Sequence, residues 1–349
     1  AIVKTAVSLH SLSHHSDPNH LHETASEMSS PPLSQPTINA AELLTKINHV
    51  RTSLQEVIRD KANVIDAVLI AMLAEGSVLL EDVPGVGKTT LAKSLARLID
   101  LEFQRIQCTP DLLPADIIGS SVFRPSSGTF EFRAGPVFSN LLIADEINRA
   151  SPRTQSALLE AMAESQVTVD GKRYVLKRPF IVIATQNPSG FEGTFPLPES
   201  QLDRFLMRLS MDYPDTNSEI ELLLEQAASD PASALTPVMT GDELTALQSF
   251  VRKVKVDRKA VAYIVEIAAA TRTDTRLRVG VSPRGSKMLM RAAQAKAVLL
   301  GRDYVLPDDV QSLAPSILSH RVSPRNAIAT SEETTLIIVD LLKSIEVPV

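Results

Sequence analysis

The feature that most constrains this 349-residue chain is a glycine-rich loop at residues 82–90, which reads Asp-Val-Pro-Gly-Val-Gly-Lys-Thr-Thr. An apolar run at 77–80 precedes the loop, and apolar residues at helical spacing follow it from Leu91. This order predicts a strand, a tight loop and the start of a helix. Backbone N–H groups at a helix N-terminus attract anions, and glycines let the chain wrap a phosphate closely. The alternative is a glycine-rich turn that only caps the helix.

The polar residues of the loop are the types that bind phosphate groups and their metal ion. Lys88 supplies a mobile cation for β- and γ-phosphates, and Thr89 supplies a hydroxyl ligand for Mg²⁺. The match to the phosphate-binding pattern is incomplete, because Asp82 stands where the first glycine is expected. The residues that we expect to bind the nucleotide are Pro84, Gly85, Val86, Gly87, Lys88, Thr89 and Thr90.

Two adjacent carboxylates follow a second apolar run. Residues 141–144 are continuously apolar, as in a buried parallel strand, and Asp145 and Glu146 come directly after them. Ligands of open α/β sheets bind at the carboxyl ends of the strands. We therefore expect Asp145 to hold Mg²⁺, through water, and Glu146 to polarise an attacking water. A strand that simply ends at a charged turn is the alternative.

A third apolar run, residues 180–185, ends in Gln-Asn-Pro. Pro188 stops the strand and biases Asn187 towards an extended backbone. The Asn187 amide at this strand tip is a candidate for orienting the lytic water against the γ-phosphate. An asparagine in an ordinary turn before proline explains the same pattern.

Further short motifs occur along the chain. The motifs lie at residues 84–89, 144–150, 154–162, 184–188, 202–205, 281–284 and 301–305. Their order and spacing resemble those of the MoxR family of AAA+ ATPases. The resemblance covers roughly Thr37 to Arg321, which is most of the chain.

The resemblance implies an α/β fold, in which an AAA+ P-loop NTPase αβα core with a five-stranded parallel sheet precedes a C-terminal all-helical lid domain. We expect a disordered Ser/His/Pro-rich leader over 1–36, the ATPase core over 37–213 and the lid over 214–349. Turn residues predict β-hairpin inserts at about 120–135 and 166–178. In related ATPases such hairpins face the pore of a ring or its substrate, and decoration of a sheet edge is the alternative.

The sequence pattern by itself supports a helical second domain. Apolar residues recur at helical spacing over 218–227, 240–251, 258–272, 286–300 and 307–319. No strand pattern separates these segments, so we expect no strand after residue 214.

The resemblance also implies roles for two arginines and for the strand-tip residues. Arg204 matches the arginine finger, which reaches the ATP of a neighbouring subunit, and Arg284 matches sensor 2, which acts from the lid. Both side chains supply permanent positive charge for a γ-phosphate, and surface or ion-pairing roles are the alternatives. The remaining matches are Walker A at Lys88 and Thr89, Walker B at Asp145 and Glu146, and sensor 1 at Asn187.

One departure from the family pattern bears on nucleotide preference. The family often has a glycine followed by Gln or Lys before the helix that precedes the loop, in a region that lies near the adenine. Here the site reads Arg59-Asp60-Lys61, so the glycine is absent. The preference for ATP is therefore less firmly indicated than hydrolysis.

Composition narrows the function classes. The formal charge of −6 argues against a strongly basic nucleic-acid surface. The single cysteine, Cys108, excludes an internal disulfide and is compatible with a reducing compartment, so we expect a cytoplasmic location. No apolar run approaches the ~20 residues of a membrane helix, so no membrane insertion is expected. The leader carries histidines at positions 10, 14, 15, 20 and 22, which we interpret as a solvated tail, with a metal-binding cluster as the alternative.

These observations predict a Mg²⁺-dependent ATPase, and the resemblance implies that it couples ATP hydrolysis to chaperone-like remodelling or maturation of protein complexes. The resemblance implies a ring homo-oligomer, usually a hexamer, a partner protein with a von Willebrand factor A domain and a protein client. A nucleic-acid-dependent AAA+ motor or loader is the main alternative. A nucleotide-gated binding switch is the third, and Glu146, Asn187 and Arg204 argue against it.

Overall fold

A computed structural model describes residues 40–83, 85–187, 194–224, 231–326 and 328–348. All of these residues belong to one compact unit, Ile38–Val349. The expected disordered leader, with its histidines, lies outside the described residues, and so does Pro84. The domain boundary that we expect at 213/214 stays a prediction.

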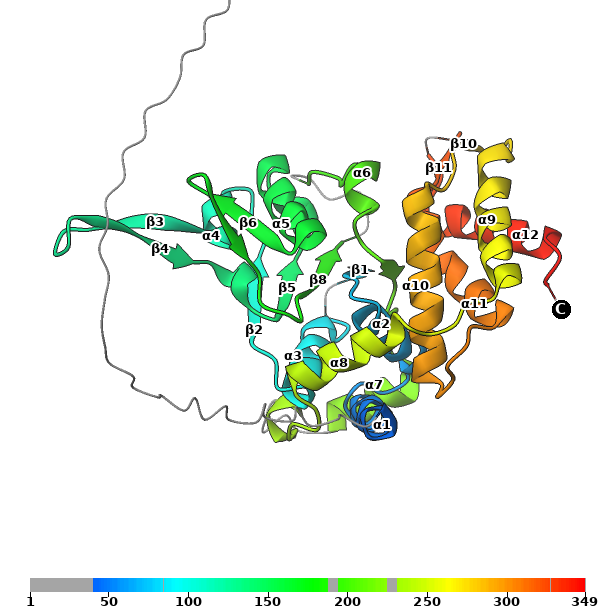
Figure 1. Cartoon of the computed structure of the whole chain (residues 1–349), viewed down its shortest axis with the longest axis horizontal. Coiled ribbons are helices and arrows are strands. Elements are labelled where there is room, and N and C mark those ends of the chain that lie inside the picture. Colours follow the sequence, from blue (N-terminus) through cyan, green and yellow to red (C-terminus); the bar gives the residue numbers. More distant parts are fainter. Residues whose placement is uncertain (1–39, 84, 188–193, 225–230, 327, 349) are drawn as a thin grey trace, which may run out of the picture. The chain divides into compact units, whose positions relative to one another are not determined.

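The elements alternate between strands and helices in the first part of the chain and are mainly helical in the second (Figure 1). The first part contains α1 (Ala40–Val57), α2 (Ala62–Leu73), β1 (Val78–Glu81), α3 (Lys88–Leu98), β2 (Phe103–Gln107), α4 (Pro114–Ile118), β3 (Gly119–Arg124), β4 (Thr129–Ala134), β5 (Leu141–Asp145), α5 (Pro152–Glu164), β6 (Gln166–Val169), β7 (Lys172–Val175), β8 (Ile181–Gln186), α6 (Glu199–Leu202) and β9 (Met207–Leu209). The second part contains α7 (Thr216–Leu224), α8 (Gly241–Val251), α9 (Arg258–Thr273), β10 (Leu277–Val279), α10 (Pro283–Leu299), α11 (Pro307–Leu318), β11 (Ser323–Pro324) and α12 (Ser331–Ser344).

The predicted five-stranded parallel sheet is confirmed. Its strand order is β2-β5-β8-β1-β9, and every neighbouring pair is parallel. Parallel neighbours need crossover connections, which explains why helices lie between successive strands of this sheet. Because all five strands run in one direction, the carboxyl ends of β1, β5 and β8 lie at the same edge.

Both faces of the sheet are buried. Leu80, Ile143 and Ile183 belong to a hydrophobic cluster that includes residues of α1, α2, α3, α8 and α10. Their sequence neighbours Leu79 and Leu142 belong to a second cluster with residues of α4 and α5. Side chains alternate between the faces of a strand, so a strand that is covered on both faces is apolar throughout. The continuous apolar runs in the sequence therefore reflect a central sheet between two helical layers.

The region after residue 214 is helical, as expected, with one difference. Strands β10 and β11 form a short antiparallel ladder in which Leu277 pairs with Pro324 and Val279 pairs with Ser323. The expectation of no strand in this region is wrong in that detail, because segments this short carry no periodic pattern of their own. Among the described residues, no helix is long and apolar enough to cross a membrane.

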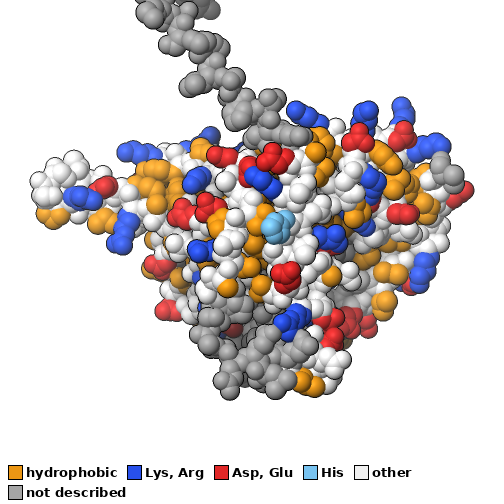
Figure 2. All heavy atoms as spheres, turned by 90° about the horizontal axis from the view of Figure 1, so that it is seen from below, with side chains coloured by type: hydrophobic (Ala, Val, Ile, Leu, Met, Phe, Trp, Pro, Cys, Tyr) orange, Lys and Arg blue, Asp and Glu red, His pale blue; other side chains and the backbone are white. Residues whose placement is uncertain are grey.

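Two antiparallel hairpins project from the sheet layer, one formed by β3 and β4 and the other by β6 and β7 (Figure 1). The hairpins contact each other through aromatic rings, because Phe132 of β4 stacks on Tyr174 of β7 with centroids 4.0 Å apart. Towards its tip the β3–β4 hairpin exposes Phe123 and Phe130, which are 51% and 73% accessible. Figure 2 shows this hairpin as a narrow projection and shows acidic and basic side chains interspersed over the face in view.

The aromatic contact should couple the two hairpins energetically. In a double-mutant cycle, Phe132→Ala and Tyr174→Ala should show a coupling free energy of about 0.5–1.5 kcal/mol, the range for a stacked aromatic pair. The measurement is urea unfolding of the single and double variants. The exposed Phe130 serves as the matched control and should show no coupling to Tyr174. Equal coupling in both cycles would contradict a specific contact.

Candidate active site

The loop between β1 and α3 adopts a conformation that requires its glycines. Gly85 and Gly87 have φ values of 90° and 93°, in the left-handed region, and Gly87 is the N-cap of α3. Because α3 begins directly after Gly87, its first N–H groups have no acceptor within the helix and are available to an anion.

Lys88 is buried against the loop. Its ammonium donates hydrogen bonds to the carbonyl oxygens of Asp82 and Val83, at 3.0 and 3.2 Å. Burial lowers the pKa of Lys88, and the negative charges of Asp82, Asp145 and Glu146 oppose that shift. The structure therefore keeps a desolvated cation at the mouth of the loop.

Asp82, which departs from the phosphate-binding pattern, has a structural role. Its buried carboxylate accepts hydrogen bonds from the backbone N–H groups of Met211 and Asp212, at 2.7 and 3.0 Å, and from the Ser210 hydroxyl at 2.7 Å. These bonds tie the start of the loop to the segment that follows β9. The aspartate thus substitutes a side-chain anchor for the flexible glycine of the pattern.

Eight of the expected site residues meet in one cavity of about 310 Å³. The cavity lies at the carboxyl edge of the sheet, where β5 and β8 end next to the start of α3. The expected residues that line it are Lys88, Thr89, Asp145, Glu146 and Asn187, together with Gly85, Gly87 and Thr90 of the loop. The structure therefore brings the loop and both strand tips together.

Polar partners that the sequence analysis missed hold the two carboxylates. The Thr185 hydroxyl donates to Asp145 Oδ1 at 3.3 Å and accepts from the Glu146 N–H at 2.9 Å. Arg105 of β2 forms an ion pair with Asp145, its Nε lying 2.7 Å from Oδ2. Burial and these same acids raise the pKa of the neighbouring Cys108 thiol to about 12, so it stays protonated at neutral pH. No local pattern separates Thr185 or Arg105 from other strand residues, because their pairing follows from strand order.

Glu146 has a strained backbone at the end of β5. Its φ of 55° lies in the left-handed region, which non-glycine residues rarely adopt and which is enriched at functional sites. Its carboxylate faces the Asn187 amide, with Nδ2 and Oε1 3.5 Å apart, and accepts a hydrogen bond from Arg149 at 3.1 Å. The backbone turn therefore directs the side chain towards the amide at the tip of β8.

The cavity suits a metal ion that arrives with a nucleotide. Among the described residues, no group of three or more His, Cys, Asp or Glu side chains is placed to hold a metal by itself. Mg²⁺ in nucleotide sites uses one or two protein ligands, phosphate oxygens and water. Thr89 and Asp145 line the same cavity and offer such oxygen ligands.

The two expected arginines lie elsewhere. Arg204 and Arg284 line a second cavity of about 320 Å³, which shares no lining residue with the first. Gly76 and Ser77 before β1, and Pro179 and Phe180 before β8, also line it, so it lies at the amino edge of the sheet. Within one chain, the structure does not bring these arginines to the loop.

A buried arginine that the sequence analysis did not assign positions this pair. Arg321, whose side chain is 1% exposed, forms an ion pair with Asp203 at 3.0 Å and donates to the carbonyl oxygens of Leu206 and Asp203. Arg284 lies 3.9 Å from the other Asp203 oxygen. Burial lowers the pKa of Arg321 to about 10, so it remains cationic at neutral pH. Asp203 therefore connects the turn that carries Arg204 to α10 and to the end of α11.

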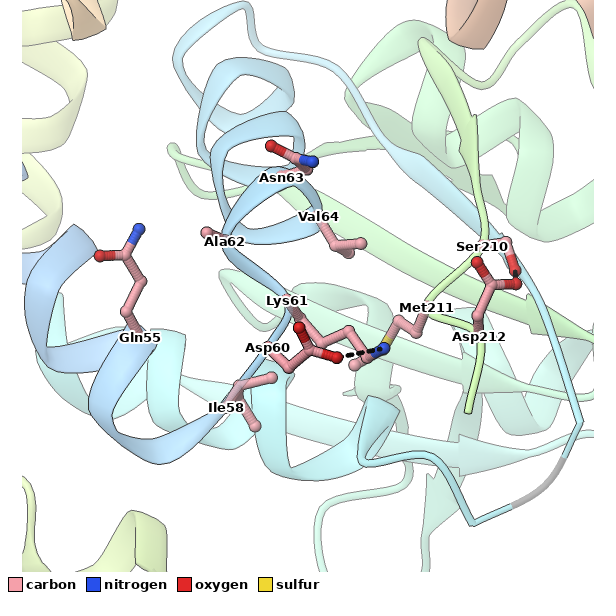
Figure 3. Close-up of a pocket in the computed structure, with 10 residues that line it drawn as sticks. All are labelled: Gln55, Ile58, Asp60, Lys61, Ala62, Asn63, Val64, Ser210, Met211 and Asp212. Atoms are coloured by element: carbon pink, nitrogen blue, oxygen red, sulfur yellow. Dashed lines mark hydrogen bonds and ion pairs between the residues drawn. The ribbon is translucent and has the colours of Figure 1, made fainter. Parts of the chain in front are cut away.

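A third cavity, of about 560 Å³, lies beside the loop (Figure 3). Residues at the α1–α2 junction and residues that follow β9 line it, and Figure 3 shows Lys61 reaching towards Met211. Asp60 stands where the family glycine is absent, and its φ is 60°, again in the left-handed region. The backbone shape that favours glycine is thus retained with an aspartate.

The fold and the first cavity define the class of protein. A family model described as "ATPase family associated with various cellular activities (AAA)" matches residues 77–207, and a model described as "AAA lid domain" matches residues 269–340. The chain is an AAA+ protein and an ATP hydrolase.

Comparison with individual proteins narrows the class further. The chain is 49% identical to Uncharacterized protein YeaC of Bacillus subtilis over 297 residues, covering 85% of this chain and 93% of that protein. It is 38% identical to Chaperone MoxR1 of Mycobacterium tuberculosis over 332 residues, covering 91% and 88%. A solved structure of a putative ATPase from Cytophaga hutchinsonii matches with a TM-score of 0.80 and 37% identity, covering 88% of this chain and 97% of that chain. The chain belongs to the MoxR family of AAA+ ATPases.

The anchoring role of Asp82 is testable. The variant Asp82→Gly restores the glycine of the phosphate-binding pattern but removes a buried acceptor of three hydrogen bonds. We expect the free energy of unfolding to fall by about 3 kcal/mol, because hydrogen bonds to a charged group contribute about 1.5–3 kcal/mol each and water replaces part of them. Urea unfolding measures the change. Asp303→Gly, at an exposed aspartate, is the control, and an equal loss in both variants would contradict the anchor.

Proposed function

We propose that this chain hydrolyses Mg²⁺-ATP at sites that two subunits of a ring share. One subunit supplies the loop, Asp145, Glu146 and Asn187, and its neighbour supplies Arg204 and Arg284. The observation that carries the proposal is that the acids Asp145 and Glu146 and the two arginines line separate cavities at opposite edges of one sheet.

The distance between the cavities supports a shared site. Strand β8 separates them, and its six residues span roughly 17 Å at about 3.3 Å per residue. An arginine side chain is shorter than this, so neither arginine reaches the γ-phosphate of an ATP on its own loop. A second copy of the chain that places its amino-edge cavity against the carboxyl-edge cavity would complete the site.

The described side chains support a division of chemical labour. Lys88 and the N-terminus of α3 bind the β- and γ-phosphates, and Thr89 and Asp145 hold the Mg²⁺. Glu146 accepts a proton from the attacking water, and the Asn187 amide, 3.5 Å from it, orients that water. When bound, Mg²⁺ neutralises charge on the phosphates. Arg204 and Arg284 of the neighbour stabilise the charge that develops in the transition state.

We place the nucleobase of the bound nucleotide in the cavity of Figure 3. This cavity adjoins the loop, because Met211 Cε lies 4.0 Å from the position that a Cβ on Gly87 would take. When the phosphates of a nucleotide lie in the loop, its nucleobase could lie in this adjoining cavity without a movement of α2. This placement favours a nucleoside triphosphate such as ATP over inorganic polyphosphate.

The ring would couple hydrolysis to chaperone-like remodelling of a protein client. The relative named Chaperone MoxR1 supports this role, and the exposed Phe123 and Phe130 on the β3–β4 hairpin offer an apolar contact for a polypeptide. We further propose a hexamer and a separate partner with a von Willebrand factor A domain, both on the family resemblance.

The first test removes Glu146, the proposed general base. Glu146→Gln should bind ATP with unchanged affinity but hydrolyse it about 100-fold or more slowly, because general-base catalysis contributes about 10²–10⁴-fold. Phosphate release and binding of a fluorescent ATP analogue measure the two quantities. Glu160→Gln, on the exposed face of α5, is the matched control and should keep full turnover. Turnover near the wild-type rate in Glu146→Gln would remove Glu146 from the mechanism.

The second test asks whether Arg204 acts across a subunit boundary. Arg204→Ala should lower turnover by about 10³-fold, the lower end of the range for an arginine finger. Lys88→Ala should be inactive because it lacks the phosphate site. Mixing the two variants should restore turnover at hybrid interfaces, where the Arg204→Ala subunit keeps an intact loop and its neighbour supplies Arg204. Mixed rings without any gain would show that Arg204 does not act on a neighbour.

A further inference from the structure

The cavity around Arg204 and Arg284 carries more positive charge than those two arginines. Five cationic side chains line it, and Glu75 is the one carboxylate among the lining residues. The cations are Arg178, Arg204, Arg284, Lys287 and Arg291. An enclosed excess of one sign of charge raises the local concentration of oppositely charged ligands.

Glu75 is the carboxylate that acts on two of the additional cations, Arg178 and Arg291. It lies 3.9 Å from Arg178 and also pairs with Arg252 outside the cavity. Burial lowers the pKa of Arg291, and Glu75 is the nearby negative charge that opposes this shift. Arg178 and Arg252 share the single negative charge of Glu75, and Arg291 donates a hydrogen bond to Gln294 at 3.4 Å, so each of these arginines already has a protein partner.

Lys287 is different. It lies on α10 three residues after Arg284, so the two side chains share one face of the helix. It is exposed, and in the described part of the chain it has neither an ion pair nor a side-chain hydrogen bond. An ammonium has three donors on a flexible stem and binds phosphate as a point charge. Among the cations that line this cavity in the described part of the chain, Lys287 can therefore bind an anion without first breaking an ion pair or a hydrogen bond.

We propose that Lys287 is a third cation in trans, which contacts the triphosphate held by the loop of the neighbouring subunit beside Arg204 and Arg284. This inference rests on the proposed function, because it requires a shared site. Lys287 lies one helical turn beyond Arg284 and lines the same cavity, so both side chains would face the same triphosphate. There it stabilises the charge that develops as the terminal phosphoryl group leaves, and it transfers no proton.

A role in the transition state makes a specific kinetic prediction. Lys287→Ala should lower kcat about tenfold, less than Arg204→Ala, because a single exposed lysine contact is weaker than a bidentate guanidinium. Lys287→Arg should retain most of the activity, and Lys287→Glu should fall below the alanine variant. The affinity of the loop for ATP in Lys287→Ala should be unchanged. Lys253→Ala, at an exposed lysine that does not line this cavity, is the matched control.

Mixed rings decide whether Lys287 acts in trans. Lys287→Ala is titrated with an excess of Lys88→Ala, whose subunits supply an intact Lys287 but hydrolyse nothing. A second mixture contains wild-type subunits and Lys88→Ala in the same ratio. Turnover per Lys287→Ala subunit should rise to the turnover per wild-type subunit in that second mixture. A kcat that stays at the wild-type value in Lys287→Ala, an equal loss in Lys253→Ala, or a loss that mixing does not restore would each overturn the proposal.

The same series separates failure of this inference from failure of the proposed function. If Arg204→Ala keeps wild-type turnover, the shared site itself is wrong, whatever Lys287 does. If Arg204→Ala is impaired and is rescued by Lys88→Ala while Lys287→Ala behaves as wild type, the shared site stands and Lys287 has no part in it.

Discussion

The common direction of the five strands is the constraint on which the rest of this structure depends. A parallel sheet that is buried on both faces exposes polar backbone and side chains only at its two edges. The tips of β5 and β8 and the loop after β1 therefore meet at the carboxyl edge, and their side chains line one cavity. The same geometry places Arg204 and Arg284 at the other edge. One chain thus carries two separate polar cavities, which the proposed function treats as the two halves of a shared site.

Buried charged groups hold the residues around both cavities in place. At the carboxyl edge, the Asp82 carboxylate ties the loop to the segment after β9 through three hydrogen bonds. At the amino edge, Arg321 pairs with Asp203 and so positions the turn that carries Arg204. Removing one partner of a buried charged pair costs several kcal/mol, because it leaves the other charge without compensation. Asp82 and the Arg321–Asp203 pair hold neighbouring segments in place, and none of these residues lines the cavity that it supports.

Much of the carboxyl-edge site was predictable from the sequence, for local reasons. The Gly-Val-Gly-Lys-Thr segment is contiguous, and Asp145 and Glu146 directly follow an apolar run, so strand and site are encoded within a few residues. Thr185, Arg105 and Arg321 were not predictable in the same way. Their partners lie 39 or more residues away in the chain, and strand order and helix packing bring them together. The β10–β11 ladder was missed because each strand is too short for a periodic signal.

The sequence by itself determined that this chain forms a glycine-rich loop before a helix, a buried parallel sheet and a helical second region. These follow from contiguous residues and from their apolar spacing, which act over one element at a time. Only the tertiary structure decided that Arg204, Arg284 and Lys287 gather in a cavity of their own, a strand length from Lys88. The physical reason is that a side chain reaches a few ångströms, whereas strand direction and packing set separations of a whole element.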